Sequence, residues 1–164
     1  MQPTTPLALV IGANRGIGLE VCRQLGQNCM RMLLGARDPA KGKVAADTLA
    51  REGIVVQTVI HGRDGCGERQ RRCRASRFDQ VLVNNAGVDY DTDQTALAAD
   101  LVRVRRILET NLLGAWIVAG AFAPGMRERG WGRIVNVSSG AGSLAEMRRV
   151  ISTAKSTGRL AYQQ

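Results

Sequence analysis

The chain has 164 residues, 45% of them apolar, which predicts one compact domain spanning residues 1–164 with a hydrophobic core. Its formal net charge of +9 favours anionic partners such as phosphates or nucleic acids, but charge alone does not choose among them. The cysteines lie in pairs seven residues apart and only one histidine is present, so we predict no metal site. The first apolar run is too short for a secretion signal or a membrane span, which predicts a reduced, cytoplasmic protein with no membrane partner.

Short apolar runs alternate with helical patterns along the chain. Helices are expected at 16–26, where Ile17, Val21 and Leu25 recur at helical spacing, at 39–52, and once or twice within 97–122. Strands are expected at 7–11, 32–36, 54–60, 79–85 and 132–139. This alternation predicts an α/β fold, a Rossmann-like doubly wound parallel sheet of about five strands.

The segment 61–77 interrupts the alternation. It holds six arginines and three glycines with almost no apolar stripe, so we predict an exposed connection there and not a crossover helix.

A glycine-rich loop stands between the first predicted strand and the first predicted helix. Glycines let the backbone turn sharply and approach a pyrophosphate, whose charge is favoured by the N–H groups and dipole of the helix N-terminus. Because the loop has the required strand before it and helix after it, we predict a dinucleotide site. Its expected cofactor contacts are Gly12, Asn14, Arg15, Gly16, Ile17 and Gly18.

The loop resembles the T-G-x-x-x-G-I-G motif of the short-chain dehydrogenase/reductase family, and "GANRGIGLEVCRQL" is similar to carbonyl-reductase-like members. Three more family motifs are matched in order by "NNAG" at 84–87, "ETNLLGAW" and "GRIVNVSSGAG". The resemblance implies hydride transfer between a nicotinamide cofactor and a small-molecule carbonyl or alcohol. It also implies that the cofactor is bordered by Asn85, Ala86 and Gly87. Asn111 would help to hold a proton-relay water, and Ser139, or less favourably Ser138, would hydrogen-bond the substrate carbonyl.

Two arginines bear on the choice of cofactor. Arg37 follows the second predicted strand, where an acidic residue would bind the ribose diol of NAD and an arginine suits the 2′-phosphate of NADP. With Arg15 in the glycine loop, charge-assisted hydrogen bonds favour NADP(H) over NAD(H). Two solvated surface arginines in a basic chain are the alternative.

The chain departs from the family at the catalytic pair. The resemblance makes Lys155 the lysine that holds the nicotinamide ribose and lowers the pKa of a tyrosine four residues earlier, but Ile151 occupies that position. Isoleucine cannot donate a proton, and neither Tyr90 nor Tyr162 has the required spacing, so we expect impaired catalysis.

Other departures concern the cofactor and the length of the chain. Ile11 replaces a threonine that would tie the glycine loop to the 84–87 segment, and Asp64 is displaced from the position expected beside the adenine. We also expect that the last strands of the sheet and the substrate-binding region are missing. We hypothesise local frame changes in the encoding DNA between Thr58 and Gln80 and after Glu146, or a degraded or truncated family member.

Three functional classes remain open. The first is an NADP(H)-dependent carbonyl reductase or alcohol dehydrogenase, with Asn111, Ser139 and Lys155 as its catalytic positions. The second is a catalytically inactive nucleotide-binding protein. It would act as a homo-oligomer, because an exposed sheet edge leaves backbone groups that can pair with another chain. The third, a basic module that binds anions or nucleic acid through 63–77, is disfavoured because that segment lacks interleaved aromatics.

Overall fold

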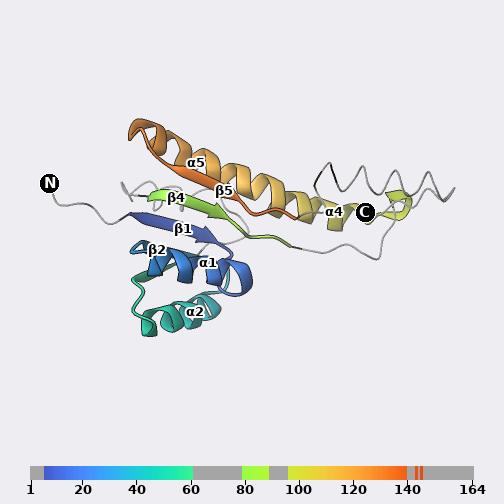
Figure 1. Ribbon diagram of the computed structural model, residues 1–164. Coiled ribbons are helices and arrows are strands. Elements are labelled where there is room, and N and C mark those ends of the chain that lie inside the picture. Colours follow the sequence, from blue (N-terminus) through green and yellow to red (C-terminus); the bar gives the residue numbers. More distant parts are fainter. Residues whose placement is uncertain (1–5, 61–78, 89–95, 140–142, 144, 146–164) are drawn as a thin grey trace.

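The computed structural model describes residues 6–60, 79–88, 96–139, 143 and 145 (Figure 1). Five parallel strands form one sheet in the order β3-β2-β1-β4-β5. The strands are β1 Leu7–Ile11, β2 Arg31–Ala36, β3 Val56–Ile60, β4 Asp79–Asn84 and β5 Arg133–Asn136. The helices are α1 Gly16–Gln27, α2 Pro39–Arg51, η1 Ala96–Ala98, α4 Leu101–Leu108, η2 Glu109–Gly114 and α5 Ala115–Glu128. The predicted Rossmann-like parallel sheet is thus confirmed.

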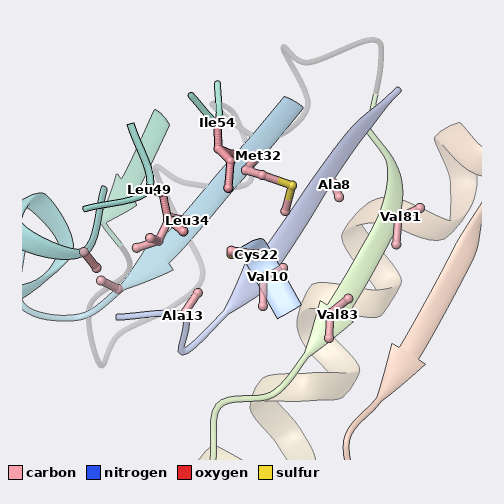
Figure 2. Packing of buried hydrophobic residues seen from close by; sticks show 12 residues of the cluster. Ala8, Val10, Ala13, Cys22, Met32, Leu34, Leu49, Ile54, Val81 and Val83 are labelled. Atoms are coloured by element: carbon pink, nitrogen blue, oxygen red, sulfur yellow. The ribbon is translucent and has the colours of Figure 1, made fainter. Parts of the chain in front are cut away.

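Helices cover both faces of the sheet, with α1 and α2 on one side and α5 on the other (Figure 1). Side chains of β1 alternate between the two layers: Ala8 and Val10 join the cluster under α1 and α2, and Leu9 joins Phe122 and Met126 of α5. Figure 2 shows the larger cluster, in which Cys22 of α1 lies over the sheet. Burial on both faces explains why β1 and β2 read as apolar runs, whereas β5 is exposed along its length.

The third strand begins later than the sequence predicts. Ile54 is buried, and its N–H donates to the Leu49 carbonyl at 3.1 Å, so it closes the end of α2 instead of pairing with β2. Its side chain packs so tightly on α1 that a Cβ added to Gly26 would lie 2.3 Å from it. The apolar character of Ile54 therefore serves the packing between α1 and the α2–β3 turn.

The long apolar pattern forms one continuous helix, Leu101–Glu128, made of α4, the π-helical turn η2 and α5. It runs beyond the predicted end at Phe122 and includes Pro124, which removes one backbone donor. Phe122 and Met126 are buried against the sheet, and this burial favours continuing the helix through the proline. The helix ends before Gly130, whose φ of +70° closes the turn.

Among the described residues, Leu101–Glu128 is the one helix long and apolar enough to cross a membrane by length and composition. Its α5 part packs on the second face of the sheet through Phe122 and Met126, whereas α4 and η2 contain no buried residue.

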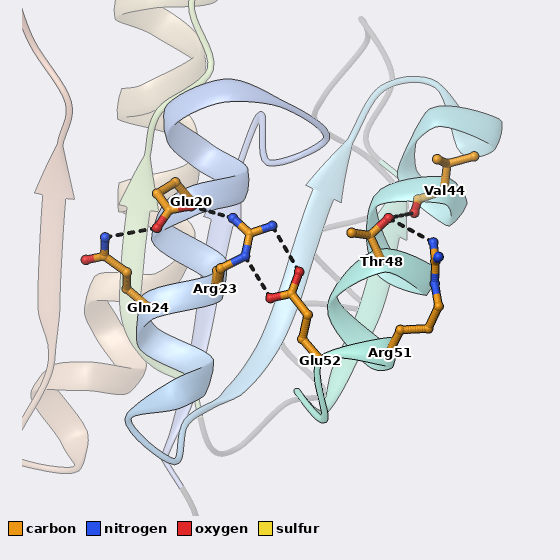
Figure 3. A network of polar contacts seen from close by, with 7 residues as sticks. All are labelled: Glu20, Arg23, Gln24, Val44, Thr48, Arg51 and Glu52. Atoms are coloured by element: carbon orange, nitrogen blue, oxygen red, sulfur yellow. Dashed lines mark hydrogen bonds and ion pairs between the residues drawn. The ribbon is translucent and has the colours of Figure 1, made fainter.

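A polar network joins the first two helices on their outer side (Figure 3). Arg23 of α1 donates to both carboxylate oxygens of Glu52, at 2.7 and 3.1 Å, and also pairs with Glu20. Hydrogen bonds from Gln24 and Arg23 lower the pKa of Glu20. Because Glu52 directly follows α2, this ion pair links α1 to the end of α2.

Candidate nucleotide-binding site

The glycine loop occupies residues 12–15, between the end of β1 and the start of α1. Gly12 and Gly16 have φ values of +72° and +56°, in the left-handed region that L side chains rarely adopt. Nothing lies within 4 Å of a Cβ built on Gly16, so this glycine borders open space. The loop therefore offers backbone that a ligand can approach closely.

Gly12 in the loop and Gly18 in the first turn of α1 both lie against the segment that follows β4. A Cβ on Gly12 would lie 2.8 Å from the Cα of Ala86. A Cβ on Gly18 would lie 2.5 Å from Nδ2 of Asn85 and 2.6 Å from the carbonyl oxygen of Gly12. Gly12 and Gly18 are thus required by packing within the protein, whereas Gly16 is the glycine that faces outward.

The N-terminus of α1 differs from that of α2. At α2, the Asp38 carboxylate accepts hydrogen bonds from the N–H groups of Ala40 and Lys41, at 2.9 and 3.1 Å. Among the described residues, no side chain caps α1, whose N-cap is Arg15, and its first turn has no acidic residue. The first N–H groups of α1 are therefore left for an external anion.

The structure places both predicted arginines near the carboxyl end of the sheet. Arg15 ends the glycine loop, Arg37 directly follows β2, and both are exposed. Within the described part of the chain, neither guanidinium makes a hydrogen bond or an ion pair. Of the predicted apolar stripe, Val21 and Leu25 pack against the core beside the buried Cys22, but Ile17 is 64% exposed and the prediction is wrong there. Its exposure beside the open Gly16 is compatible with the predicted cofactor contact.

Asn85 connects the glycine loop to the 84–88 segment. Its Nδ2 donates to the carbonyl oxygen of Gly12 at 3.1 Å and to that of Ile11 at 3.4 Å. The Asn85 side chain therefore connects the glycine loop to this segment, although Ile11 has no hydroxyl that could do so. The next residue, Ala86, packs on Gly12, and Gly87 is exposed.

Asn111 lies in the π-helical turn η2 and holds the end of the same segment. Its Oδ1 accepts from the Val88 N–H at 2.9 Å, and its Nδ2 donates to the Val88 carbonyl at 3.1 Å. Single π-helical turns occur frequently at functional sites. The structure thus brings Asn111 to the end of the 84–88 segment, a contact that the sequence did not predict.

Asn84 and Asn136 form a contact that was not predicted from the sequence. Asn84 is buried, and its Nδ2 donates to Oδ1 of Asn136 at 2.9 Å and to the Ala115 carbonyl at 3.3 Å. The two asparagines are register partners on β4 and β5. The sequence did contain a signal for this contact, because an asparagine ends each of two neighbouring parallel strands. Register partners project from the same face of a sheet, so these two side chains can meet.

The remaining predicted residues are only partly described. Ser138 and Ser139 are exposed and follow β5 at the same edge. The predictions for Lys155, Ile151, Asp64, both tyrosines and the arginine-rich segment lie outside the described residues. Within the described ranges, no three His, Cys, Asp or Glu side chains gather as metal ligands would, and the absence of a metal site stays a prediction.

A glycine loop that joins the central strand of a parallel sheet to an uncapped helix is typical of the dinucleotide-binding sites of Rossmann folds. The sequence model of the short chain dehydrogenase family matches residues 6–158, so the chain belongs to that family.

Known relatives cover most of this chain. The chain is 31% identical over 167 aligned residues to (+)-neomenthol dehydrogenase of Arabidopsis thaliana, covering 87% of this chain and 56% of that protein. It is 32% identical over 149 residues to carbonyl reductase [NADPH] 1 of Bos taurus, and the alignment covers 85% of this chain and 50% of that protein. The chain thus spans about half the length of these curated relatives.

Solved structures show the same fold. A metagenomic short-chain oxidoreductase in complex with NADP superimposes with a TM-score of 0.77 at 26% identity, covering 94% of this chain and 77% of that one. The F189W actinorhodin polyketide ketoreductase with NADPH gives a TM-score of 0.73 at 31% identity, and the superposition covers 94% of this chain and 64% of that one.

Proposed function

We propose that the chain binds NADP(H) at the carboxyl edge of the sheet, around the glycine loop. The observation that carries this proposal is the uncapped N-terminus of α1 beside the open Gly16, in contrast to α2, which Asp38 caps. Such an arrangement suits a pyrophosphate, whose charge is favoured by free N–H groups and the helix dipole. Solved relatives that hold NADP or NADPH support the choice of ligand.

NADP(H) is favoured over NAD(H) because of Arg15 and Arg37. Both are exposed, cationic and without partners among the described residues. The 2′-phosphate that distinguishes the two cofactors would accept charge-assisted hydrogen bonds from guanidinium groups. The name of the bovine relative, a carbonyl reductase marked NADPH, agrees with this preference.

Carbonyl reduction, or the reverse oxidation of an alcohol, is the chemistry that we propose for the family site. Bound NADPH would supply the hydride to the carbonyl carbon of a small-molecule substrate. On the protein side, Ser139 would donate a hydrogen bond to the carbonyl oxygen, Asn111 would orient a water, and Lys155 would hold the nicotinamide ribose. The carbonyl oxygen must also receive a proton, and the isoleucine side chain of Ile151 cannot deliver it. We therefore expect a turnover rate that is ~10²–10⁴-fold lower than with a tyrosine at this position.

A catalytically inactive nucleotide-binding protein is the second candidate, favoured by Ile151. A fluorescence titration with NADPH, followed by carbonyl-dependent NADPH oxidation by the chain and by Ile151→Tyr, separates the two candidates. Saturable binding with slow oxidation that the tyrosine accelerates would support the reductase. Binding without oxidation in either protein would support the inactive binder, and no binding at millimolar NADPH would overturn both.

The wider setting that we propose is a cytoplasmic homo-oligomer. The outer side of α5 supports assembly, because Trp116 and Ile117 remain exposed there while Phe122 and Met126 face the sheet. Nucleic acid is not the partner we favour. Salt-dependent nucleic-acid binding that is lost when the arginines of 63–77 become glutamine would contradict this preference.

A further inference from the structure

The strand β5 forms one outer edge of the sheet. It pairs in parallel with β4, and in the part of the chain that the structure describes it pairs with no other strand. Directly after β5, the N–H of Val137 donates to the Asn84 carbonyl at 2.9 Å. Backbone groups point alternately to the two sides of a strand, so those of Ile134 and Asn136 point away from β4. They are therefore available to a further strand.

The face of β5 on the α1 side of the sheet is apolar and uncovered. On β4, Val83 is buried in the cluster beneath α1 and α2, whereas its register partner Val135 on β5 is 47% exposed. Val137 projects from the same face and is 41% exposed. An exposed edge strand with β-branched residues and no proline is a template for pairing with another chain.

A second copy of β5 fits this edge by symmetry. Two such strands can pair antiparallel across a two-fold axis that passes through Val135. Ile134 then lies opposite Asn136 of the other copy, and their outward N–H and C=O groups exchange hydrogen bonds. The two Val135 side chains meet on the α1 side, so each buries apolar surface of the other.

The charge distribution of the edge is compatible with a second copy. Arg133 is the only charged residue from 133 to 137, and in this register it lies opposite Val137, away from its own counterpart. Its guanidinium lies 5.3 Å from the centre of the Trp131 ring in the same chain and donates to the Gly132 carbonyl at 2.9 Å. Arg133 therefore has partners within its own chain, which favours a second copy over an acidic peptide as the occupant.

We propose that two copies of this chain pair through β5, antiparallel and in register at Val135, and so form one continuous sheet. The pairing specifies a contact of the homo-oligomer proposed above and rests on that proposal, but it does not depend on NADP(H) binding. Because both copies use the same edge, the contact closes at two copies.

Disulfide cross-linking tests the register. Directly opposed residues that share no hydrogen bond have Cα atoms ~4.5 Å apart, within the range for a disulfide. Val135→Cys should therefore give a disulfide-linked dimer under mild oxidation, with peptide mass spectrometry showing that the two substituted positions are joined.

Val137→Cys is the matched control, because Val137 lies on the same face and is similarly exposed. Its two copies would lie ~14 Å apart along the paired strands, too far for a disulfide. We expect about tenfold more linked dimer from Val135→Cys than from Val137→Cys or from the wild type, whose native cysteines give the background.

Hydrogen exchange tests the edge without any substitution. The N–H groups of Ile134 and Asn136 should become hydrogen-bonded only when two copies pair, whereas Val137 already donates to Asn84. Raising the concentration of the wild-type chain should slow exchange at Ile134 and Asn136 about tenfold and leave Val137 within about twofold.

Equal cross-linking of the two cysteine variants, or exchange at Ile134 and Asn136 that does not depend on concentration, would overturn the β5 pairing. Slow exchange at these two residues already in the dilute chain would also overturn it, by showing that the same chain covers the edge. If light scattering finds an oligomer but Val135→Cys does not cross-link, this contact fails and the proposed homo-oligomer stands. A wild-type chain that is monomeric at every concentration would overturn both.

Discussion

Arg37 is the residue at which we expect discrimination between the two nicotinamide cofactors. It is exposed directly after β2 and has no partner among the described residues. A hydrogen bond to a charged group contributes ~1.5–3 kcal/mol, so Arg37→Ala should weaken NADPH binding about ten- to hundredfold. NADH, which lacks the 2′-phosphate, should bind the variant with nearly unchanged affinity in the same fluorescence titration.

Arg31 provides a control on the same strand. It is also exposed, but it begins β2, at the opposite end from the glycine loop. Arg31→Ala should leave the affinity for both cofactors unchanged. If Arg37→Ala weakens NADH as much as NADPH, Arg37 does not read the 2′-phosphate.

Cys22 predicts a pH dependence of stability. Burial of this thiol in the core raises its pKa to about 12, from an ordinary value of 9.0. The Cys22 thiol therefore loses its proton at lower pH in the unfolded chain than in the folded chain. The contribution of the buried neutral thiol to folding stability is fully present below pH 9 and is lost as the pH rises towards 12. In this window Cys22 lowers the free energy of unfolding by ~1.4 kcal/mol per pH unit. Cys22→Ala should flatten the curve there when denaturant unfolding is followed against pH.

The exposed Cys29 is the comparison for Cys22. Cys29→Ala should leave the slope between pH 9 and 12 unchanged. Equal slopes for the wild type and Cys22→Ala would contradict the burial argument.

At the scale of elements, Asp38 is expected to stabilise α2 through its cap. Its carboxylate accepts two backbone N–H hydrogen bonds at the first turn, and Pro39 occupies the first helical position. Loss of such a cap typically costs ~1 kcal/mol, so Asp38→Ala should reduce the free energy of unfolding by about that amount. Asp47→Ala on the same helix removes only an exposed pair with Lys43 and should cost less than ~0.5 kcal/mol. Chemical denaturation that shows equal losses would count against the cap.

The elements themselves could be predicted from sequence because their signals are local. The runs that become β1 and β2 are short and apolar, and the Asp38-Pro39 pair marks the start of α2. Their ends depended on contacts distant in sequence: Ile54 packs on Gly26, and burial of Met126 carries α5 through Pro124. The π-helical turn at Asn111 has no periodicity signal of its own.

The same distinction applies to the site. Glycine spacing identified the loop, but it could not separate Gly16, which faces open space, from Gly12 and Gly18, which pack against the 84–88 segment. Likewise, the motif named Asn85 without showing that its amide bonds to Gly12. Such assignments require the register of β1 and β4, which no local pattern contains.

At the scale of the whole molecule, the outer side of α5 predicts self-association. No charged residue lies between Glu109 and Arg127, and from Ala115 to Met126 every residue of the helix is apolar, glycine or proline, on the side facing the sheet and on the side facing away. Leu112 in η2 is 53% exposed, and Trp116 and Ile117 of α5 are 71% and 38% exposed. A helix that is apolar all round is normally buried, and a second copy would bury this side without placing a charge against it.

Trp116→Glu should therefore shift the chain towards monomer, because dimer formation would desolvate the new carboxylate. Light scattering coupled to size-exclusion chromatography over a concentration series measures the shift. Val44→Glu is the matched control, since Val44 is 66% exposed on α2 and lies on the other face of the sheet. A wild-type chain that stays monomeric throughout the series, or a Val44 variant that dissociates equally, would show that a second copy does not cover α5.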